Sequence, residues 1–233
     1  MTRNALFALA CLAAVGACSN PMKTGRYLID PPVTGERVPD RIGSAELKDV
    51  SLPGYASGDE VAWQSGDGAV RLANRSLWAD QPQRAFTQTL ARTISDLSGA
   101  TVIAEPWPLS EPPRKKLEVR VEKALAQADG VYRLSGRYFV ADDAAGGSNQ
   151  ARSFDISVPM ASDEPAAIAA AQSTAISQLA RQIATLGGPG QSIRTSTPRS
   201  SSIFSEALPG FEGSDRPPHT GGPAWEEERS SRA

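Results

Sequence analysis

Cysteine is the residue type whose position points most directly to chemistry in this 233-residue sequence. There are two cysteines, Cys11 and Cys18, and the second ends the run Val15-Gly16-Ala17-Cys18. An aliphatic residue, two small residues and a cysteine resemble the lipobox of bacterial lipoproteins. There the signal peptidase needs a slim, extended backbone, and the cysteine sulfur becomes acylated. The motif therefore predicts Cys18 as a lipidation site.

The residues ahead of Cys18 have the composition of a signal peptide. Arg3 provides a basic start, and residues 5–15 are apolar and uncharged. This run is shorter than the ~20 residues that span a bilayer, but it fits the apolar region of a signal peptide. We therefore expect residues 1–17 to be removed. The alternative is an ordinary secretory signal cut near Ala17, which would leave Cys18 as an exposed thiol in an oxidising compartment.

Lipidation at Cys18 would decide where the protein works. Each buried CH₂ group contributes about 0.8 kcal/mol, so the acyl chains of a lipoprotein hold it to a membrane in practice permanently. Residues 18–25 then form the lipid anchor and a tether of at most ~25 Å, which keeps the folded part near that membrane and facing the periplasm. The residue after the cysteine is Ser19 rather than an aspartate, which favours the outer membrane over the inner membrane.

Few of the remaining residues could act in catalysis. The one histidine, His219, lies in a Pro-rich segment near the carboxyl end. Without a histidine or cysteine in the folded part, neither a zinc site nor a histidine-based triad is expected. The carboxylate pairs Asp142-Asp143 and Asp129 with Glu122 fall at expected turns, where solvation explains them better than acid–base catalysis. We therefore predict a protein with no catalytic residues, no metal site and no cofactor.

Charge also excludes a class of partner. The formal net charge is −2, and no basic stripe with interleaved aromatic residues occurs. Because binding to nucleic acid depends on such basic surfaces, no nucleic-acid partner is expected.

Strands are predicted wherever apolar and polar residues alternate. The clearest case is Leu117, Val119 and Val121, each flanked by a charged residue. Such alternation gives one dry and one wet face, as in antiparallel sheets. The expected strands cover residues 26–30, 46–52, a hairpin over 61–72, and residues 101–104, 116–122, 132–140 and 154–158.

Two helices are predicted from apolar residues three and four positions apart. The first begins with Asp80 as its N-cap and Pro82 in its first turn, and Gly99 ends it. The second begins near residues 162–165 and ends at Gly187-Gly188-Pro189. The expected fold class is α/β, more narrowly α+β. It is a mixed, largely antiparallel sheet with two main amphipathic helices packed on it, forming a domain over 26–188, followed by a disordered tail over 189–233.

Five residues at the ends of these elements are candidates for binding a partner: Leu52, Pro53, Tyr55, Trp78 and Trp107. Large aromatic side chains at such positions often anchor interfaces. They also often close the end of a hydrophobic core, and for Trp78 this packing role is the favoured interpretation. For Tyr55, which follows a Pro-Gly turn, the two roles are about equally supported.

Several segments together resemble one protein family. They are Tyr27-Leu28, Val50-Ser51-Leu52-Pro53-Gly54-Tyr55, Leu77-Trp78-Ala79-Asp80, the helix with Phe86 and Leu90, and Leu117-Glu118-Val119-Arg120-Val121. The chain over roughly 26–187 is similar to the ABC-type transport auxiliary lipoproteins, the family of paraquat-inducible protein C. That family usually starts with a tyrosine-rich "YYxL" segment, where this chain has Arg26-Tyr27-Leu28.

The resemblance implies a non-catalytic auxiliary or scaffold component of an MCE-type ABC transport system that moves lipids between the inner and outer membranes. The implied partners are an MCE-domain protein and the permease and ATPase of the transporter. The alternative is a periplasmic lipoprotein that itself binds a lipid or another apolar ligand. A homo-oligomer is also open, because the sequence does not specify the oligomeric state.

Overall fold

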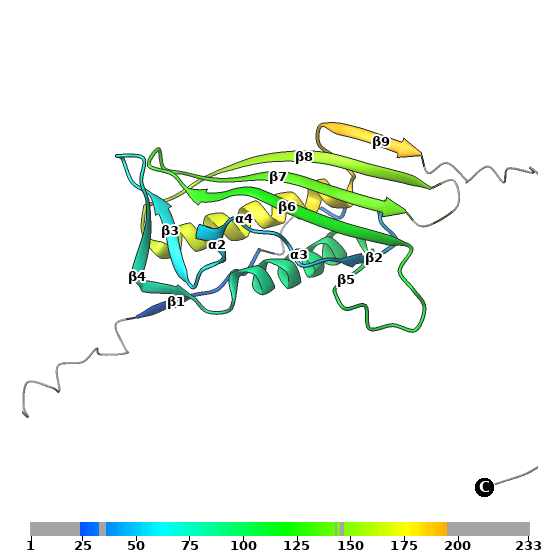
Figure 1. Cartoon of the computed structure of the whole chain (residues 1–233), viewed down its shortest axis with the longest axis horizontal. Helices are drawn as coiled ribbons and strands as arrows, with labels where there is room; N and C mark the ends of the chain where they lie inside the picture. The colour runs from blue at the N-terminus through cyan, green and yellow to red at the C-terminus, as the bar shows by residue number, and fades with distance from the viewer. Residues whose placement is uncertain (1–23, 33–35, 143, 145–146, 195–233) are drawn as a thin grey trace, which may run out of the picture. The chain divides into compact units, whose positions relative to one another are not determined.

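The computed structural model describes residues 24–32, 36–142, 144 and 147–194. These residues form a nine-stranded, mixed and mostly antiparallel sheet that carries two long helices on one face (Figure 1). This arrangement confirms the predicted fold class. The predicted signal peptide, Cys18, and residues 195–233 of the predicted tail lie outside the described residues. Within the described part of the chain, no helix is long and apolar enough to cross a membrane.

Four neighbouring strands make the antiparallel part of the sheet. They are β6 (Lys115–Ala126), β7 (Val131–Asp142), β8 (Ser148–Pro159) and β9 (Gly190–Arg194). Buried and exposed residues alternate along β6, β7 and the second half of β8. One face of this part therefore belongs to the core and the other faces solvent, as the alternating sequence predicts.

Strand β6 is shared by two groups of shorter strands. Its first residues pair in parallel with β2 (Ser44–Leu47), which also pairs with β5 (Thr101–Ala104). Its last residue pairs with β3 (Glu60–Gln64), which continues the sheet to β4 (Val70–Trp78) and β1 (Gly25–Tyr27). Between β2 and β3, this edge of β6 has no regular strand partner, so the sheet is divided there. The chain that connects β2 to β3 lies at this division.

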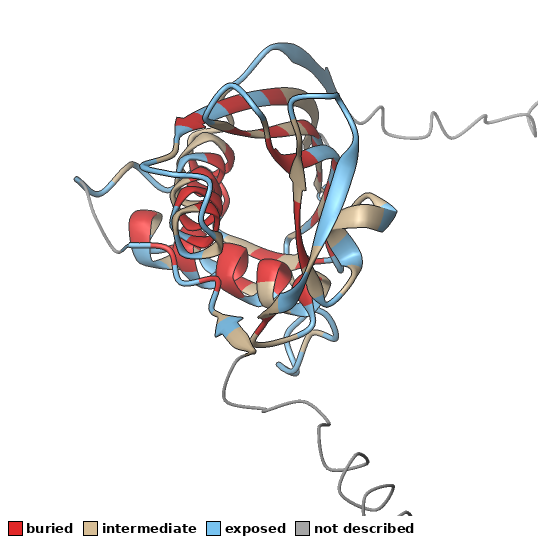
Figure 2. Cartoon of the chain, turned by 90° about the vertical axis from the view of Figure 1, so that its left-hand side faces the viewer, coloured by how far each residue is buried: buried red, intermediate tan, exposed pale blue. Residues whose placement is uncertain are grey.

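Two helices bury their apolar stripes against the sheet. The predicted stripe Phe86, Leu90, Ile94 and Leu97 lies on α3 (Pro82–Ser98) and is buried. Helix α4 (Pro165–Ala184) packs against α3 and against β7 and β8. Figure 2 looks onto the end of the domain where β1 lies and shows buried residues on the helix surfaces turned toward the sheet. A short third helix, α2 (Gly54–Ser57), contacts α3 and β3.

Some predicted boundaries were wrong by a few residues. The strand expected over 46–52 ends at Leu47, because its regular pairing with β6 stops there and returns only as an isolated bridge at Ser51, before α2 begins. The first strand, expected over 26–30, is the shorter β1. Its length is set by β4, which it pairs with over three residues.

The predicted N-cap of α3 was also wrong. Gln81, not Asp80, is the N-cap, and its side chain makes no capping bond. The Asp80 carboxylate instead accepts the backbone N–H of Gln81 at 2.7 Å and pairs with the Arg84 guanidinium. Pro82 at the first helical position needs no cap for its own nitrogen, since proline has no N–H.

Strand β9 lies inside the segment that the sequence assigned to the disordered tail. Only Ile193 in it is a large apolar residue, and all five residues are exposed, so no alternation marks the strand. Its order comes from backbone pairing with β8. Gly190 allows this approach, because a Cβ atom there would lie 2.0 Å from the carbonyl oxygen of Ala151.

Candidate interaction sites

The five predicted partner-binding residues lie in three separate places. Leu52, Pro53 and Tyr55 are at the division of the sheet, Trp78 ends β4, and Trp107 lies in the loop between β5 and β6. The structure therefore does not assemble them into one surface. Each place has its own packing and has to be judged separately.

Tyr55 fills the gap along the edge of β6. The backbone N–H of Ala124 donates a hydrogen bond to the Tyr55 hydroxyl at 3.3 Å. Opposite Ala124, β2 has already ended, and β3 pairs with β6 only at Ala126. A strand N–H without a partner would be costly, so the hydroxyl replaces the missing strand. This gives Tyr55 a structural role, which the sequence weighed equally against an interface role.

Tyr55 also lies near a second tyrosine, Tyr132, on the inner face of β7. Burial raises the pKa of Tyr132 above its ordinary value, and the neighbouring Tyr55 raises it further. Tyr132 is 2% exposed, whereas Tyr55 is half-buried. No sequence pattern relates these two residues, because they are brought together only by the position of α2.

Leu52 and Pro53 belong to the same connection. Just before them, the Ser51 N–H donates to the Val119 carbonyl at 3.1 Å, and the Val121 N–H donates back to Ser51 at 2.9 Å. Leu52 is half-buried against the core, and Pro53 is partly exposed. The segment thus lies along β6 as a partial strand. Its packing accounts for the apolar residues that the sequence singled out.

Trp78 is buried. Its side chain is 6% exposed and belongs to the main core, and its backbone N–H donates to the Asp59 carbonyl at 2.7 Å. This is the packing role favoured for Trp78 by the sequence. Trp78 therefore contributes little to the surface of the domain.

Trp107 differs from the others because a polar network holds it at the surface. Its backbone N–H donates to the Glu46 carboxylate at 2.8 Å, and its indole N–H donates to the Glu111 carbonyl at 2.7 Å. Two positions later Leu109 is 53% exposed. The loop over 105–114 thus presents an apolar residue from a fixed base, at the end of the domain opposite β1 (Figure 1).

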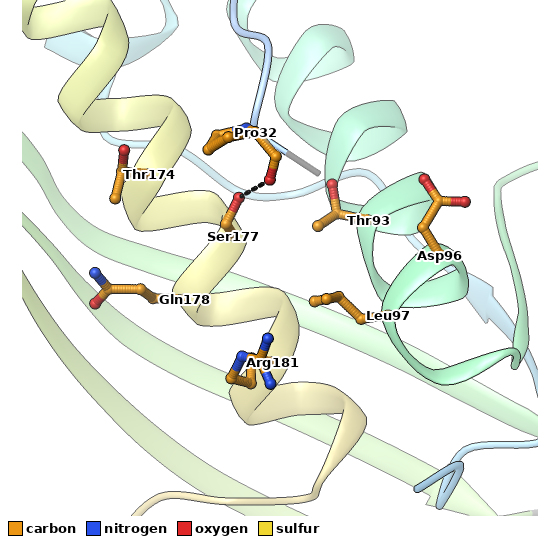
Figure 3. Close-up of a pocket in the computed structure, with 8 residues that line it drawn as sticks. All are labelled: Pro32, Thr93, Asp96, Leu97, Thr174, Ser177, Gln178 and Arg181. Atoms are coloured by element: carbon orange, nitrogen blue, oxygen red, sulfur yellow. Dashed lines mark hydrogen bonds between the residues drawn. The ribbon is translucent and has the colours of Figure 1, made fainter. Parts of the chain in front are cut away.

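A groove of about 220 Å³ runs between α3 and α4. Figure 3 shows Thr93, Asp96 and Leu97 of α3 facing Thr174, Ser177, Gln178 and Arg181 of α4, with Pro32 above them. The Ser177 hydroxyl donates to the Pro32 carbonyl at 3.4 Å, and the Arg181 guanidinium donates to the Glu36 carbonyl at 3.1 Å. These bonds fasten the chain after β1 to α4. Six of the eight residues that line the groove are polar, and its one arginine is already engaged.

The ionisable groups with altered pKa values do not suggest catalysis. A hydrogen bond from a nearby arginine is the main cause of the lowered pKa of three carboxylates, Asp80, Glu118 and Asp129. All three pairs are on the surface, where ion pairs contribute little to stability. Burial raises the pKa of Tyr138 to about 12. Within the described ranges, no three His, Cys, Asp or Glu residues are grouped as a metal ion would require.

Comparison with one solved structure supports the fold. A crystal structure of an uncharacterized protein matches with a TM-score of 0.59 and 20% sequence identity, over 70% of this chain and 98% of that one. Protein XCC0632 from Xanthomonas campestris is similar over 69% of this chain and 90% of that one, with a TM-score of 0.48 and 15% identity. Among proteins of curated function, none matches.

The family comparison is more specific. The model of the family described as the ABC-type transport auxiliary lipoprotein component matches residues 27–184. This range runs from β1 to the end of α4 and includes both helices and all strands between them. The match covers more than half of the chain and agrees with the family that the sequence motifs resemble. The chain therefore belongs to the ABC-type transport auxiliary lipoprotein family, whose members are components of ABC transport systems.

Proposed function

We propose that this protein is a periplasm-facing lipoprotein, anchored through acylated Cys18, that serves an MCE-type ABC transport system as a non-catalytic scaffold. The system would move lipids between the inner and outer membranes. The observation that carries the proposal is the family match over residues 27–184, directly preceded by a lipobox that ends at Cys18.

The positions of the first and last described residues, at opposite ends of the domain, support a scaffold role. The described residues begin at the end of the domain where β1 lies, whereas β9 ends at the opposite end (Figure 1). The twelve residues of β7 span about 40 Å between these ends, at about 3.3 Å per residue. A chain anchored a few residues before β1 would hold the first end at the membrane and direct the other toward the periplasm.

The loop over 105–114 is the proposed contact with the MCE-domain protein. It lies at the end directed away from the proposed anchor, and it exposes Leu109 beside the hydrogen-bonded Trp107. An exposed apolar residue on a fixed loop loses little conformational freedom on binding, which favours an interface. Leu52, Pro53 and Tyr55 remain secondary candidates, since their packing already explains them.

The outer membrane is the proposed location, on the basis of Ser19 after the acylated cysteine. The domain then has to reach a transporter in the opposite membrane through an MCE-domain protein. Density-gradient separation of the two membranes tests this part. Recovery of the protein with inner-membrane markers would contradict the outer-membrane location.

Affinity purification of the full chain from detergent-solubilised membranes tests the partnership. The tag belongs at the carboxyl end, away from the lipobox. We expect an MCE-domain protein, a permease and an ATPase to be recovered together, in amounts comparable to the tagged chain. Recovery of the tagged chain from intact membranes without any of these three would contradict the proposal.

A further inference from the structure

A second cavity lies at the end of the domain where the described chain begins. Its volume is about 340 Å³, and its walls come from β3, the β3–β4 turn, the end of β6, the β6–β7 turn, the connection between β8 and α4, and the start of α4. Ligand-binding cavities in proteins start at about 300 Å³. Figure 2 looks onto this end, with the helices on one side and the strands on the other.

The floor of this cavity is the hydrophobic core itself. Ala126 is 1% exposed and Ile168 is 2% exposed, and both belong to the core cluster. Trp63 and Met160 are half-buried and pack against the same cluster while they line the cavity. An apolar ligand entering here would therefore extend the core.

Several polar side chains around the cavity are engaged with one another, and the exposed Asp163 carboxylate also lines it. Gln64 donates to the Gly68 carbonyl at 3.1 Å and accepts from Gln127 at 3.2 Å. The Ser65 hydroxyl contacts the Asp67 carboxylate and the Ala69 carbonyl. The described residues that line the cavity include no lysine, arginine or histidine. No cationic side chain of this lining would pair with a phosphate or carboxylate, and the Asp163 carboxylate would repel it, so an anionic headgroup would stay outside.

The hairpin beside the cavity also carries exposed apolar residues. In the hairpin that contributes Gln64 to the wall, Val70 is opposite Gln64 and is 43% exposed. Leu72, two residues further along β4, is 47% exposed. Figure 1 places this hairpin, the β6–β7 turn, the start of α4 and β1 at the same end of the domain. With the tether at β1, this end faces the membrane, where acyl chains are abundant.

From these observations we infer that the cavity lined by Trp63, Ala126, Met160 and Ile168 binds one acyl chain of a membrane lipid, with the headgroup left outside. The inference rests on the proposed anchoring, which brings the cavity to the bilayer, and does not depend on the proposed transport partners. The group that the cavity would bind is a linear alkyl chain. It could belong to a phospholipid or to a free fatty acid.

Photo-crosslinking in living cells tests the inference with the full chain. The photoreactive residue p-benzoylphenylalanine replaces Trp63 or Met160 in the cavity, or Asp155 or Ser157 on the exposed face of β8 as matched controls. Cells are grown with radioactive phosphate, irradiated, and the chain is purified. We expect a radioactive adduct from the cavity positions and none from the controls. An adduct of fatty-acid mass without phosphate, found by mass spectrometry, would also support the inference and would identify the source.

A blocking variant makes the test specific to the cavity. Gly66 lines the cavity, and a Cβ atom there would meet no atom within 4 Å, so Gly66→Trp is the variant chosen to add a large side chain to the cavity wall. Gly54 is equally unobstructed but lies outside the lining, so Gly54→Trp is the control. Gly66→Trp should lower the amount of adduct about tenfold. This is the loss expected when about two methylene groups of the acyl chain are no longer buried.

Three results would overturn the inference: no adduct from the cavity positions, equal adducts from cavity and control positions, or crosslinks to protein alone. Membrane fractionation of the same cells separates this failure from a failure of anchoring. An anchored chain without adduct contradicts the cavity alone. A chain released into the soluble fraction contradicts the anchoring.

Discussion

The Tyr55 hydroxyl accepts a hydrogen bond from the backbone N–H of Ala124 at 3.3 Å, where neither β2 nor β3 reaches the edge of β6. A side chain thus completes the pairing of a divided sheet. This relationship explains why a tyrosine follows the Pro53-Gly54 turn. It also separates a structural role for Tyr55 from a role in binding a partner.

Tyr55→Phe should lower the free energy of unfolding by about 1–2 kcal/mol, because the Ala124 N–H loses its acceptor inside the domain. Urea unfolding of the chain with Cys18→Ser measures this change. Tyr27→Phe is the control, since Tyr27 lies on β1, which does not border β6. Recovery of the proposed partners should be unchanged by Tyr55→Phe. Unchanged stability with lost partner recovery would show that Tyr55 acts at an interface instead.

Tyr138 should make the domain less stable in alkali. Burial raises its pKa to about 12 in the folded state, against 10.0 for an unperturbed tyrosine. Above pH 10 the unfolded chain loses this proton while the folded chain keeps it, so the free energy of unfolding falls until about pH 12. Below pH 10 the Tyr138 proton contributes no pH dependence.

Tyr138→Phe should therefore flatten the decline of stability with pH above 10, as measured by urea unfolding at a series of pH values. It should not remove the decline completely, because burial raises the pKa of Tyr132 as well. An identical alkaline decline in the variant would show that Tyr138 ionises equally easily in both states.

Gly190→Ala should detach β9 from β8. The added Cβ would lie 2.0 Å from the Ala151 carbonyl oxygen, at a φ of +152° that side chains rarely adopt. Because β9 is an exposed edge strand, we expect faster hydrogen exchange in residues 190–194 and little change in global stability. Gly66→Ala, which meets no neighbour within 4 Å, is the control. Equal protection of β9 in both variants would contradict this tight approach.

Most of the fold could be predicted because its long elements carry strong periodic patterns. Leu117, Val119 and Val121 are each nearly or fully buried, as their alternation indicates. Phe86, Leu90, Ile94 and Leu97 form the buried stripe of α3, and Gly99 ends that helix with a φ of +77°. In such elements the period of the apolar residues directly reflects which side faces the core.

The features that could not be predicted depend on contacts between distant segments. Strand β9 is held by its backbone, so its side chains carry no pattern. The bond from Ala124 to Tyr55 joins residues 69 positions apart. The cavity beside Trp63 also includes Met160, which follows β8, and Ile168 of α4, whose nearness depends on the complete fold. The alternation around Trp63 indicated a strand but not a cavity.

Leu109→Asp should weaken binding of the MCE-domain protein about tenfold or more, because an apolar contact at the centre of an interface is replaced by a charge. Stability should hardly change, since Leu109 is 53% exposed. Leu72→Asp is a matched control, because Leu72 is 47% exposed at the opposite end of the domain. Binding titrations of the purified chain with the MCE-domain protein measure both variants. Equal weakening by Leu72→Asp, or none by Leu109→Asp, would exclude the 105–114 loop as the contact.

The attachment of the folded domain to a membrane through Cys18 is the claim on which the proposed function depends. Metabolic labelling with radioactive palmitate, followed by purification of the chain, measures it directly. We predict label in the natural chain and in Cys11→Ser, whose substitution lies in the expected signal peptide, and no label in Cys18→Ser. Equal labelling of Cys18→Ser, or no labelling of the natural chain, would contradict the account.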